Sequence, residues 1–323
     1  MNFKEELDFD KAIDDTEKIV LLGSALKTGI FLALTEEKDI PKLSREIGGT
    51  ERSLFIVLEA LCVMGYVNKN ETKYIIADKA RPLFIERGEE YLGGYLPHFL
   101  NKMKAWLELP LIIKGEKPGR EKPQDISAFM NAMASKPDTF VEKVIDHCIK
   151  RNKDAKTTLD LGGGPGKYAK AFVNKGISAV LYDMPETIDF VSKEFGLSDV
   201  KGLTLKKGDF TRKDFEKDFK KQSFDIVFMG NICHIYSELE NTVLIEKTTD
   251  LLKRGGLIAI EDFVRGRSSL AEMFAVNMLA NTERGNTYTE AQYRKWLEEA
   301  GFSSIEILDL PERENQLITA FLE

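Results

Sequence analysis

Cysteine, proline and long hydrophobic runs are scarce in this chain of 323 residues. Its three scattered cysteines, Cys62, Cys148 and Cys233, are too few for a disulfide framework and favour a reducing, cytoplasmic setting. Only 10 prolines stand beside 24 glycines, which argues against collagen-like or low-complexity segments. No apolar run approaches the roughly 18 residues that a membrane-spanning helix needs. The sequence therefore predicts neither a disulfide-rich, a fibrous nor a membrane-spanning protein.

An excess of positive charge is absent as well. The chain has 46 Lys and Arg against 53 Asp and Glu, which gives a formal net charge of −7. Nucleic acids and anionic membranes bind through basic surfaces, so we expect neither as a partner. The residues are 43% hydrophobic, and the length suits two domains. The composition predicts a globular protein of two domains.

Residues 1–92 have the pattern of short helices followed by a hairpin. Apolar residues recur at helical spacing, or lie between helix start and stop signals, over 19–34, 41–47 and 51–64. Strand-like residues then flank a polar turn at 68–71. This order predicts a winged helix-turn-helix.

Such a unit often binds DNA, but the helix in the reading position does not suit that role. Its residues 53–64 carry only one charge, Glu59, and residues 1–92 contain 13 Lys and Arg against 18 Asp and Glu. An apolar helix of this kind packs against protein, so a dimer interface is the favoured interpretation. A DNA-binding regulator remains the alternative.

From Thr157 onward, strands and helices alternate. Strands are expected at 158–161, 179–182, 203–206, 225–229, 257–261, 305–309 and 317–322. Helical stretches separate most of them, as a parallel sheet requires, but only Pro311 to Asn315 joins the last two. The fold class is therefore α/β: a doubly wound, Rossmann-like sheet over 151–323 with an antiparallel last strand. Connecting helices over 93–150 complete the second domain, 93–323.

A glycine loop, Asp160-Leu161-Gly162-Gly163-Gly164-Pro165-Gly166, follows the first of these strands and precedes a helix. Glycines permit a tight turn and a close approach of the backbone to a ligand at a helix N-terminus. The spacing Gly-x-Gly-x-Gly departs from the dinucleotide pattern Gly-x-Gly-x-x-Gly. Asp160 would repel a pyrophosphate and attract an ammonium group. The loop indicates a ligand with both charges, such as the aminocarboxylate of S-adenosylmethionine.

Two further acids follow at the ends of the next two strands. Asp183 lies about twenty residues on, where an acceptor holds ribose hydroxyls, and Asp209 can accept from an adenine amino group. A single such aspartate is often a solvated strand end, but three in succession favour a ligand site. The residues expected to bind the cofactor S-adenosylmethionine are Asp160, Gly162, Gly164, Asp183, Met184, Asp209 and Phe210.

His234 follows a buried-type strand at the sheet edge where open α/β folds bind ligands. A lone histidine is often structural, but this position favours a catalytic role. Cys233 beside it lacks the CxxC or HxxxH spacing of a metal site, and His98 and His147 are far away in sequence. No metal is expected, and no Gly-x-Ser-x-Gly elbow indicates a hydrolase.

In their order, these motifs resemble the small-molecule O-methyltransferases of the caffeate and hydroxyindole type. The likeness is carried by segments 159–166, 182–185, 208–210, 225–234 and 255–261 and extends over nearly the whole chain. It implies a class I methyltransferase fold, S-adenosylmethionine as cofactor, and methylation of a hydroxyl on a small, aromatic acceptor. It also implies a homodimer formed through the N-terminal winged-helix domain.

The resemblance further implies His234 as general base and Glu261 as one of two carboxylates that frame it and hold its tautomer. The second carboxylate falls at Thr287 and is missing, and a lysine common in plant members falls at Gly230. The missing acid keeps open a relative that uses the same cofactor for C-methylation or another reaction. The acceptor-lining positions are Phe129, Met133, Asn231, Met278 and Asn281, although core packing explains the methionines equally well.

Overall fold

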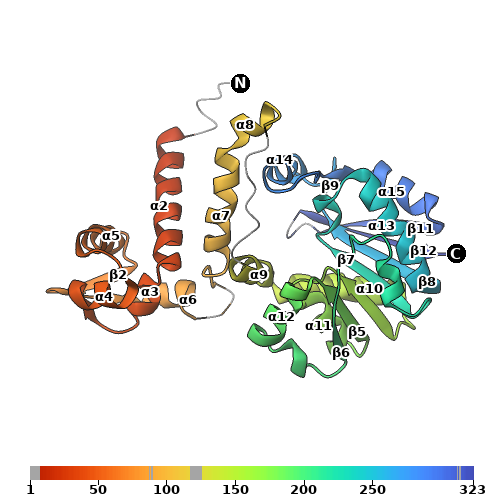
Figure 1. Cartoon of the computed structure of the whole chain (residues 1–323), viewed down its shortest axis with the longest axis horizontal. Coiled ribbons are helices and arrows are strands. Elements are labelled where there is room, and N and C mark those ends of the chain that lie inside the picture. The colour runs from red at the N-terminus through yellow and green to blue at the C-terminus, as the bar shows by residue number, and fades with distance from the viewer. Residues whose placement is uncertain (1–7, 87, 89, 117–125, 311, 313) are drawn as a thin grey trace. The chain divides into compact units, whose positions relative to one another are not determined.

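The computed structural model describes residues 8–86, 88, 90–116, 126–310, 312 and 314–323, which form two compact units (Figure 1). The first unit comprises Met1–Lys104 and Asn131–Ser135, and the second Ala105–Met130 and Lys136–Glu323. The predicted domain boundary at residue 92 remains a prediction, because compact units and functional domains need not coincide.

Helices dominate the first unit, and a small antiparallel sheet of order β1-β3-β2 completes it. Its elements are α2 (Phe9–Lys27), α3 (Ile30–Ala33), β1 (Lys38–Asp39), α4 (Ile40–Ile47), α5 (Glu51–Val63), β2 (Val67–Asn70), β3 (Lys73–Ile76), η1 (Asp78–Ala80) and α6 (Arg81–Phe84). The single helix expected over 19–34 is wrong. Gly29 adopts a left-handed φ of 78° and divides it into α2 and α3, and α2 begins at Phe9.

The second unit is built on a seven-stranded sheet of order β11-β12-β8-β7-β4-β5-β6. The strands are β4 (Thr157–Leu161), β5 (Ser178–Asp183), β6 (Leu203–Lys207), β7 (Phe224–Gly230), β8 (Leu252–Asp262), β11 (Phe302–Leu310) and β12 (Asn315–Leu322). Strand β12 runs antiparallel to both β11 and β8, which confirms the predicted reversal. Residues 311 and 313 of the link before β12 lie outside the described residues.

Helices cover both faces of this sheet. The helices α10 (Asp138–Arg151), α11 (Lys167–Asn174) and α12 (Pro185–Glu194) pack on one face, and α13 (Glu238–Leu251) and α15 (Glu290–Glu299) pack on the other. Side chains alternate along β8, so that Ala259 packs in the core beneath α10, α11 and α12, and Ile260 packs in the core beneath α13 and α15. The same alternation separates the two acids that end β8, Glu261 and Asp262.

Four helices precede or connect these layers, and a short parallel strand pair lies beside them. The helices are α7 (Tyr95–Leu107), α8 (Leu109–Ile113), α9 (Ile126–Ala134) and α14 (Ala271–Asn281), and the strands are β9 (Val264–Arg265) and β10 (Tyr288–Thr289). Short 3-10 turns lie at η2 (Leu197–Asp199), η3 (Phe215–Asp218) and η4 (Cys233–Ile235). Within the described residues, no helix has both the length and the apolar character needed to span a membrane.

Candidate active site

The glycine loop lies at the carboxyl end of β4 and leads into α11. Gly162, Gly164 and Gly166 have φ angles of 70°, 49° and 75°, values that disfavour residues with a side chain. A Cβ on Gly162 would lie 2.5 Å from Ile232 Cδ1, whereas a Cβ on Gly164 would meet nothing closer than Met130 Sδ at 3.9 Å. The loop is therefore closely packed at Gly162 and open at Gly164, where a ligand can approach the backbone.

Asp183, at the end of β5, supports this loop from the side. Its Oδ2 accepts a hydrogen bond from the Gly164 amide at 2.8 Å, and its Oδ1 accepts one from the Met184 amide at 2.7 Å. Burial raises the pKa of this carboxyl, against the opposing effect of the two amides. A carboxylate has about four acceptor sites, so hydroxyl groups of a ligand can still bind it.

Asp160 lies beneath the loop and is fully buried. Its Oδ2 accepts from the Ala169 amide in the first turns of α11 at 3.0 Å, and a Cβ on Gly163 would lie 2.6 Å from the same oxygen. Burial raises the pKa of this carboxyl to about 7. Asp160 thus joins the loop to α11, a contact that the sequence did not predict. Its attraction for a ligand ammonium group remains a prediction.

Aromatic rings lie next to the loop at the end of β6. Phe210 is buried, with its ring perpendicular to that of Tyr236 at a centroid distance of 5.8 Å. The Asp209 Oδ1 accepts from the amide and hydroxyl of Thr211 at 2.8 and 2.6 Å. Burial, and then the charges of Asp209 and Asp183, raise the pKa of the Tyr236 hydroxyl, so it lies in the field of both acids. The sequence missed Tyr236, although it stands two residues after His234.

The imidazole of His234 is fixed by a buried carboxylate. His234 Nδ1 lies 2.6 Å from Asp262 Oδ1, and the His234 backbone amide donates to Asp262 Oδ2 at 3.1 Å. Both side chains are almost fully buried, and the edge of the imidazole meets the Phe274 ring at 4.8 Å and 80°. An ionised carboxylate only accepts hydrogen bonds, so Nδ1 is the donor of this pair, and in the neutral imidazole this tautomer leaves the lone pair on Nε2.

Glu261, which the resemblance places beside His234, instead faces the opposite side of the sheet. Its Oε2 accepts from Lys136 Nζ at 2.9 Å and Tyr168 Oη at 2.9 Å, as well as from Asn231 Nδ2 at 2.7 Å. The expectation that Glu261 holds the histidine tautomer is therefore corrected. Neighbouring residues of a strand point to opposite faces, and Asp262 is the one that faces the imidazole.

The five residues expected to line the acceptor site differ from one another in burial and in hydrogen-bond partners. Asn231 has a left-handed φ of 59°, and its amide donates to the Glu261 carbonyl at 2.8 Å. Phe129 on α9 is 38% exposed, whereas Met278 on α14 is buried. The Asn281 amide group donates to the Asn277 carbonyl at 3.0 Å. Met133 belongs to the first unit. Acceptor binding by these residues remains a prediction.

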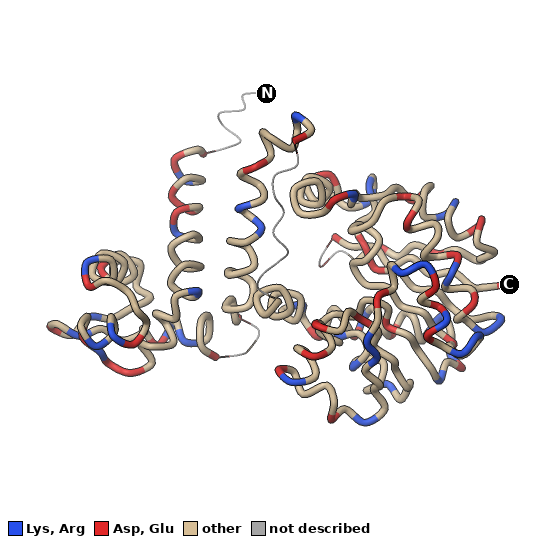
Figure 2. Tube along the Cα trace, viewed as in Figure 1, with Lys and Arg blue, Asp and Glu red and all other residues tan. Residues whose placement is uncertain are grey.

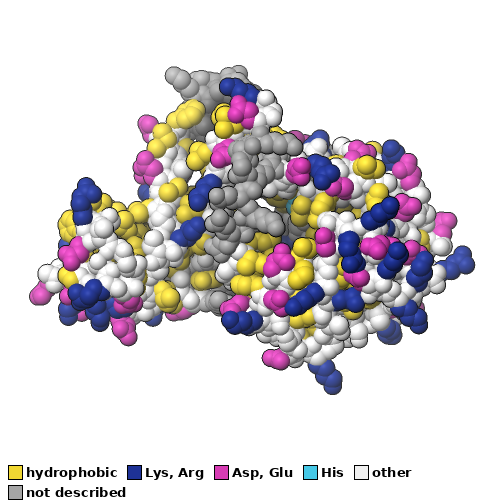
Figure 3. All heavy atoms as spheres, in the orientation of Figure 1, with side chains coloured by type: hydrophobic (Ala, Val, Ile, Leu, Met, Phe, Trp, Pro, Cys, Tyr) yellow, Lys and Arg dark blue, Asp and Glu magenta, His cyan; other side chains and the backbone are white. Residues whose placement is uncertain are grey.

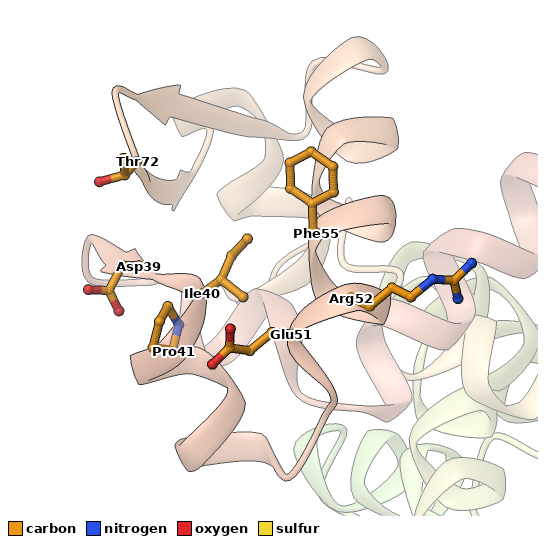
Figure 4. Close-up of a pocket in the computed structure, with 7 residues that line it drawn as sticks. All are labelled: Asp39, Ile40, Pro41, Glu51, Arg52, Phe55 and Thr72. Carbon is orange, nitrogen blue, oxygen red and sulfur yellow. The ribbon is translucent and has the colours of Figure 1, made fainter.

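A separate open hollow of about 580 Å³ lies in the first unit. It is lined by Asp39, Ile40, Pro41, Glu51, Arg52, Phe55 and Thr72 (Figure 4). Asp39 already accepts from the Lys42 amide as the cap of α4, and the lining contains no histidine or cysteine. This hollow therefore lacks the imidazole and thiol groups that most often act as base or nucleophile. Among the described residues, no group of three or more His, Cys, Asp or Glu side chains is placed to hold a metal ion.

The chain is similar to known proteins over most of its length. The family model of the O-methyltransferase domain matches residues 117–303. The 3-hydroxy-5-methyl-1-naphthoate 3-O-methyltransferase of Streptomyces sahachiroi is 23% identical over 305 residues, covering 89% of this chain and 87% of its own.

Two solved structures have a similar fold. The complex of PigF with S-adenosylhomocysteine (SAH) has a TM-score of 0.78 at 18% identity and covers 98% of this chain and 100% of its own. Human N-acetylserotonin methyltransferase in complex with S-adenosylmethionine (SAM) has a TM-score of 0.74 at 18% identity, covering 97% and 96%. At these identities, the likeness shows a common fold.

Proposed function

Because the chain belongs to the O-methyltransferase family and is a SAM-dependent enzyme, we propose that it methylates a hydroxyl of a small, aromatic acceptor with His234 as general base. One observation carries this proposal: an imidazole with Nδ1 held by Asp262 at 2.6 Å lies on the same sheet edge as the open glycine loop. The name of the S. sahachiroi relative gives a hydroxyl-bearing naphthoate as its acceptor, which supports an aromatic acceptor here.

The residues present suit the cofactor. The open backbone at Gly164 can meet its aminocarboxylate, and Asp183 retains acceptor sites for the ribose hydroxyls. Asp209 would accept from the adenine amino group, and Met184 and Phe210 would cover the ring. SAM supplies a methyl group on positively charged sulfur, which is already activated toward an oxygen nucleophile.

The protein's part is to align the acceptor and to remove its proton. His234 Nε2 accepts the hydroxyl proton as the oxygen attacks, since Nδ1 is committed to Asp262. Asp262 then stabilises the imidazolium cation, as a buried carboxylate beside a histidine does. The edge contact with Phe274 keeps the ring in one orientation.

For residues 1–92 we propose a winged-helix dimerisation domain. Helix α5 leaves Phe55, Ile56 and Val63 exposed by 48%, 51% and 90%, and hydrophobic side chains gather there in Figure 3. Figure 2 shows acidic and basic residues interspersed along the chain, with few of either on α5. Sedimentation analysis should give a dimer, and Val63→Asp should weaken it. Retarded migration of random duplex DNA at low salt would favour the alternative of a regulator.

A second candidate reaction follows from Thr287, which is buried and neutral where the resemblance expects a carboxylate. A relative without this acid would use the same cofactor for C-methylation or another reaction. The test is a panel of phenolic acceptors with SAM labelled in the methyl group, followed by mass spectrometry of the products. A labelled methyl ether supports O-methylation. A methyl group on carbon, or no transfer while the cofactor binds, contradicts it.

A further inference from the structure

Arg265 lies two residues after Phe263, which takes part in the aromatic contacts around the imidazole of His234. Only Phe263 separates β8 from β9, and the alternation of an extended chain places Phe263 and Arg265 on one side. Val264 between them is fully buried and belongs to the hydrophobic core that contains Cys233. The Phe263 ring packs on Phe274 at 4.4 Å, and Phe274 in turn touches the His234 ring. The chain therefore passes the aromatic contacts of the imidazole just before it reaches Arg265.

Among the described residues, the guanidinium of Arg265 forms hydrogen bonds to neutral groups. Its Nη2 donates to Asn286 Oδ1 at 2.5 Å, and its Nε and Nη2 lie 3.3 and 3.2 Å from Thr287 Oγ1. The Asn286 amide donates to the His234 carbonyl at 2.9 Å, so one residue links the guanidinium to the base. No carboxylate of the described residues lies within 4.0 Å of this half-buried cation.

The surrounding acids are already engaged with other groups. Glu290 and Asp309 both bind Arg267, at 2.7 and 2.8 Å, and Asp262 binds His234. Thr287 Oγ1 donates to the Ala271 carbonyl at 3.1 Å and adds no charge. The Nη1 of Arg265 has no hydrogen-bond partner among the described residues. A guanidinium has five donors in a planar fork, so this edge remains available to a further acceptor.

We propose that Arg265 binds an anionic group, a carboxylate, of the methyl acceptor. The acceptor class is then a hydroxylated aromatic carboxylate whose hydroxyl meets His234 while its carboxylate meets the guanidinium. A planar carboxylate matches the fork of an arginine with two parallel hydrogen bonds. This proposal rests on the proposed O-methylation, because it places the acceptor beside His234.

The test compares hydroxybenzoates and hydroxynaphthoates with their matched carboxamides, which differ only in the charge of one group. For the wild type we expect the best acid to exceed its amide in kcat/KM. Arg265→Gln should lower kcat/KM for the acid about 10- to 100-fold, mainly through KM, and change the amide less than about threefold. Arg265→Lys should recover part of the loss, because it keeps the charge without the fork. Arg267→Gln, which removes an arginine already paired with two acids, is the matched control.

Two outcomes overturn the proposal. Equal losses for acid and amide in Arg265→Gln would show a structural role. A wild type that binds no acid of the panel more tightly than its amide would also overturn it.

Calorimetric titration of the same compounds into the protein loaded with S-adenosylhomocysteine separates this proposal from the proposed function. If acids bind the wild type at least tenfold more tightly than Arg265→Gln but receive no methyl group, the anion site is supported and only the proposed O-methylation is contradicted.

Discussion

The sheet edge that forms the site has two halves that hold their acids in different ways. At the ends of β4, β5 and β6, three acids accept from backbone amides: Asp160 from an amide of α11, and Asp183 and Asp209 from amides of loops. At the end of β8, Asp262 and Glu261 are held by side chains, an imidazole on one face and an ammonium, a phenol and an amide on the other.

This difference suits the two halves to different roles, cofactor binding and proton removal. Backbone amides fix the acids of the glycine-loop half in one geometry, which suits a cofactor that every turnover requires unchanged. Side chains hold the acids of the β8 half, so their charge and proton position depend on individual partners. Substitutions in the β8 half should therefore change turnover, and those in the glycine-loop half should change cofactor affinity and the pH dependence of stability.

The largest effect should come from His234→Ala. Removal of the general base should lower kcat about 10²- to 10⁴-fold, while SAM still binds, because the imidazole is held by Asp262 and Phe274, which lie outside the glycine-loop half. Steady-state kinetics and calorimetry measure the two quantities. His147→Ala is the matched control, since His147 lies on α10 and pairs with Glu306 at 3.2 Å. Unchanged turnover in His234→Ala would leave catalysis to alignment alone.

The next effect distinguishes the two neighbouring acids of β8. Asp262→Asn should lower kcat about 10- to 100-fold, because the imidazole loses the charge that orients and stabilises it. Glu261→Gln should lower kcat less than about threefold but reduce the free energy of unfolding by about 1–3 kcal/mol, because partly buried Lys136 loses a charged partner. Kinetics and urea unfolding of both variants provide the comparison.

The reverse pattern would restore the assignment that the resemblance makes. If Glu261→Gln lost turnover as severely as His234→Ala while Asp262→Asn kept it, the geometry at the end of β8 would not describe the working enzyme.

The glycine-loop half could be predicted from the sequence because its determinants are local. Glycines at fixed spacing require left-handed φ angles, and an acid at each strand end lies at the same sheet edge whatever the details of packing. The seven strands and the reversed β12 followed from the same kind of pattern, since a short link cannot join parallel neighbours.

The β8 half could not be predicted, because its partners are distant in sequence. Lys136 and Glu261 are 125 positions apart, and nothing in the sequence near either one pairs them. Which of Glu261 and Asp262 faces His234 depends on the face that each residue takes, and a one-residue shift of register would exchange them. The resemblance selected the wrong neighbour for this reason.

In the glycine-loop half, Asp183→Ala should weaken SAM binding about tenfold with a smaller change in kcat. The variant loses an acceptor for the ribose hydroxyls and the support of the Gly164 amide, each a hydrogen bond to a charged group. Calorimetric titration with S-adenosylhomocysteine measures the affinity without turnover. An unchanged affinity would remove Asp183 from the cofactor site.

The smallest effect concerns Asp160 and the pH dependence of stability. Burial raises the pKa of Asp160 to about 7 in the fold from an ordinary value of 3.8, so folding favours the protonated acid. The contribution of protonated Asp160 to the free energy of unfolding is complete below about pH 4 and is lost as the pH rises through 7. The loss is at most about 4 kcal/mol. Asp160→Asn cannot titrate, so its stability should fall less than that of the wild type between pH 4 and 7.5.

Asp225→Asn should change the pH dependence of the free energy of unfolding in the direction opposite to that of Asp160→Asn. Burial tends to raise the pKa of Asp225, but the Lys253 ammonium and the amides of Lys156 and Thr157 outweigh it, so the pKa is lowered. Its stabilisation is present at neutral pH and is lost as the pH falls, which Asp225→Asn should abolish. Urea unfolding from pH 4 to 7.5 should therefore give difference curves of opposite slope for the two variants. Parallel curves would show that Asp160 is ionised in the fold and supports the loop as a charged acceptor.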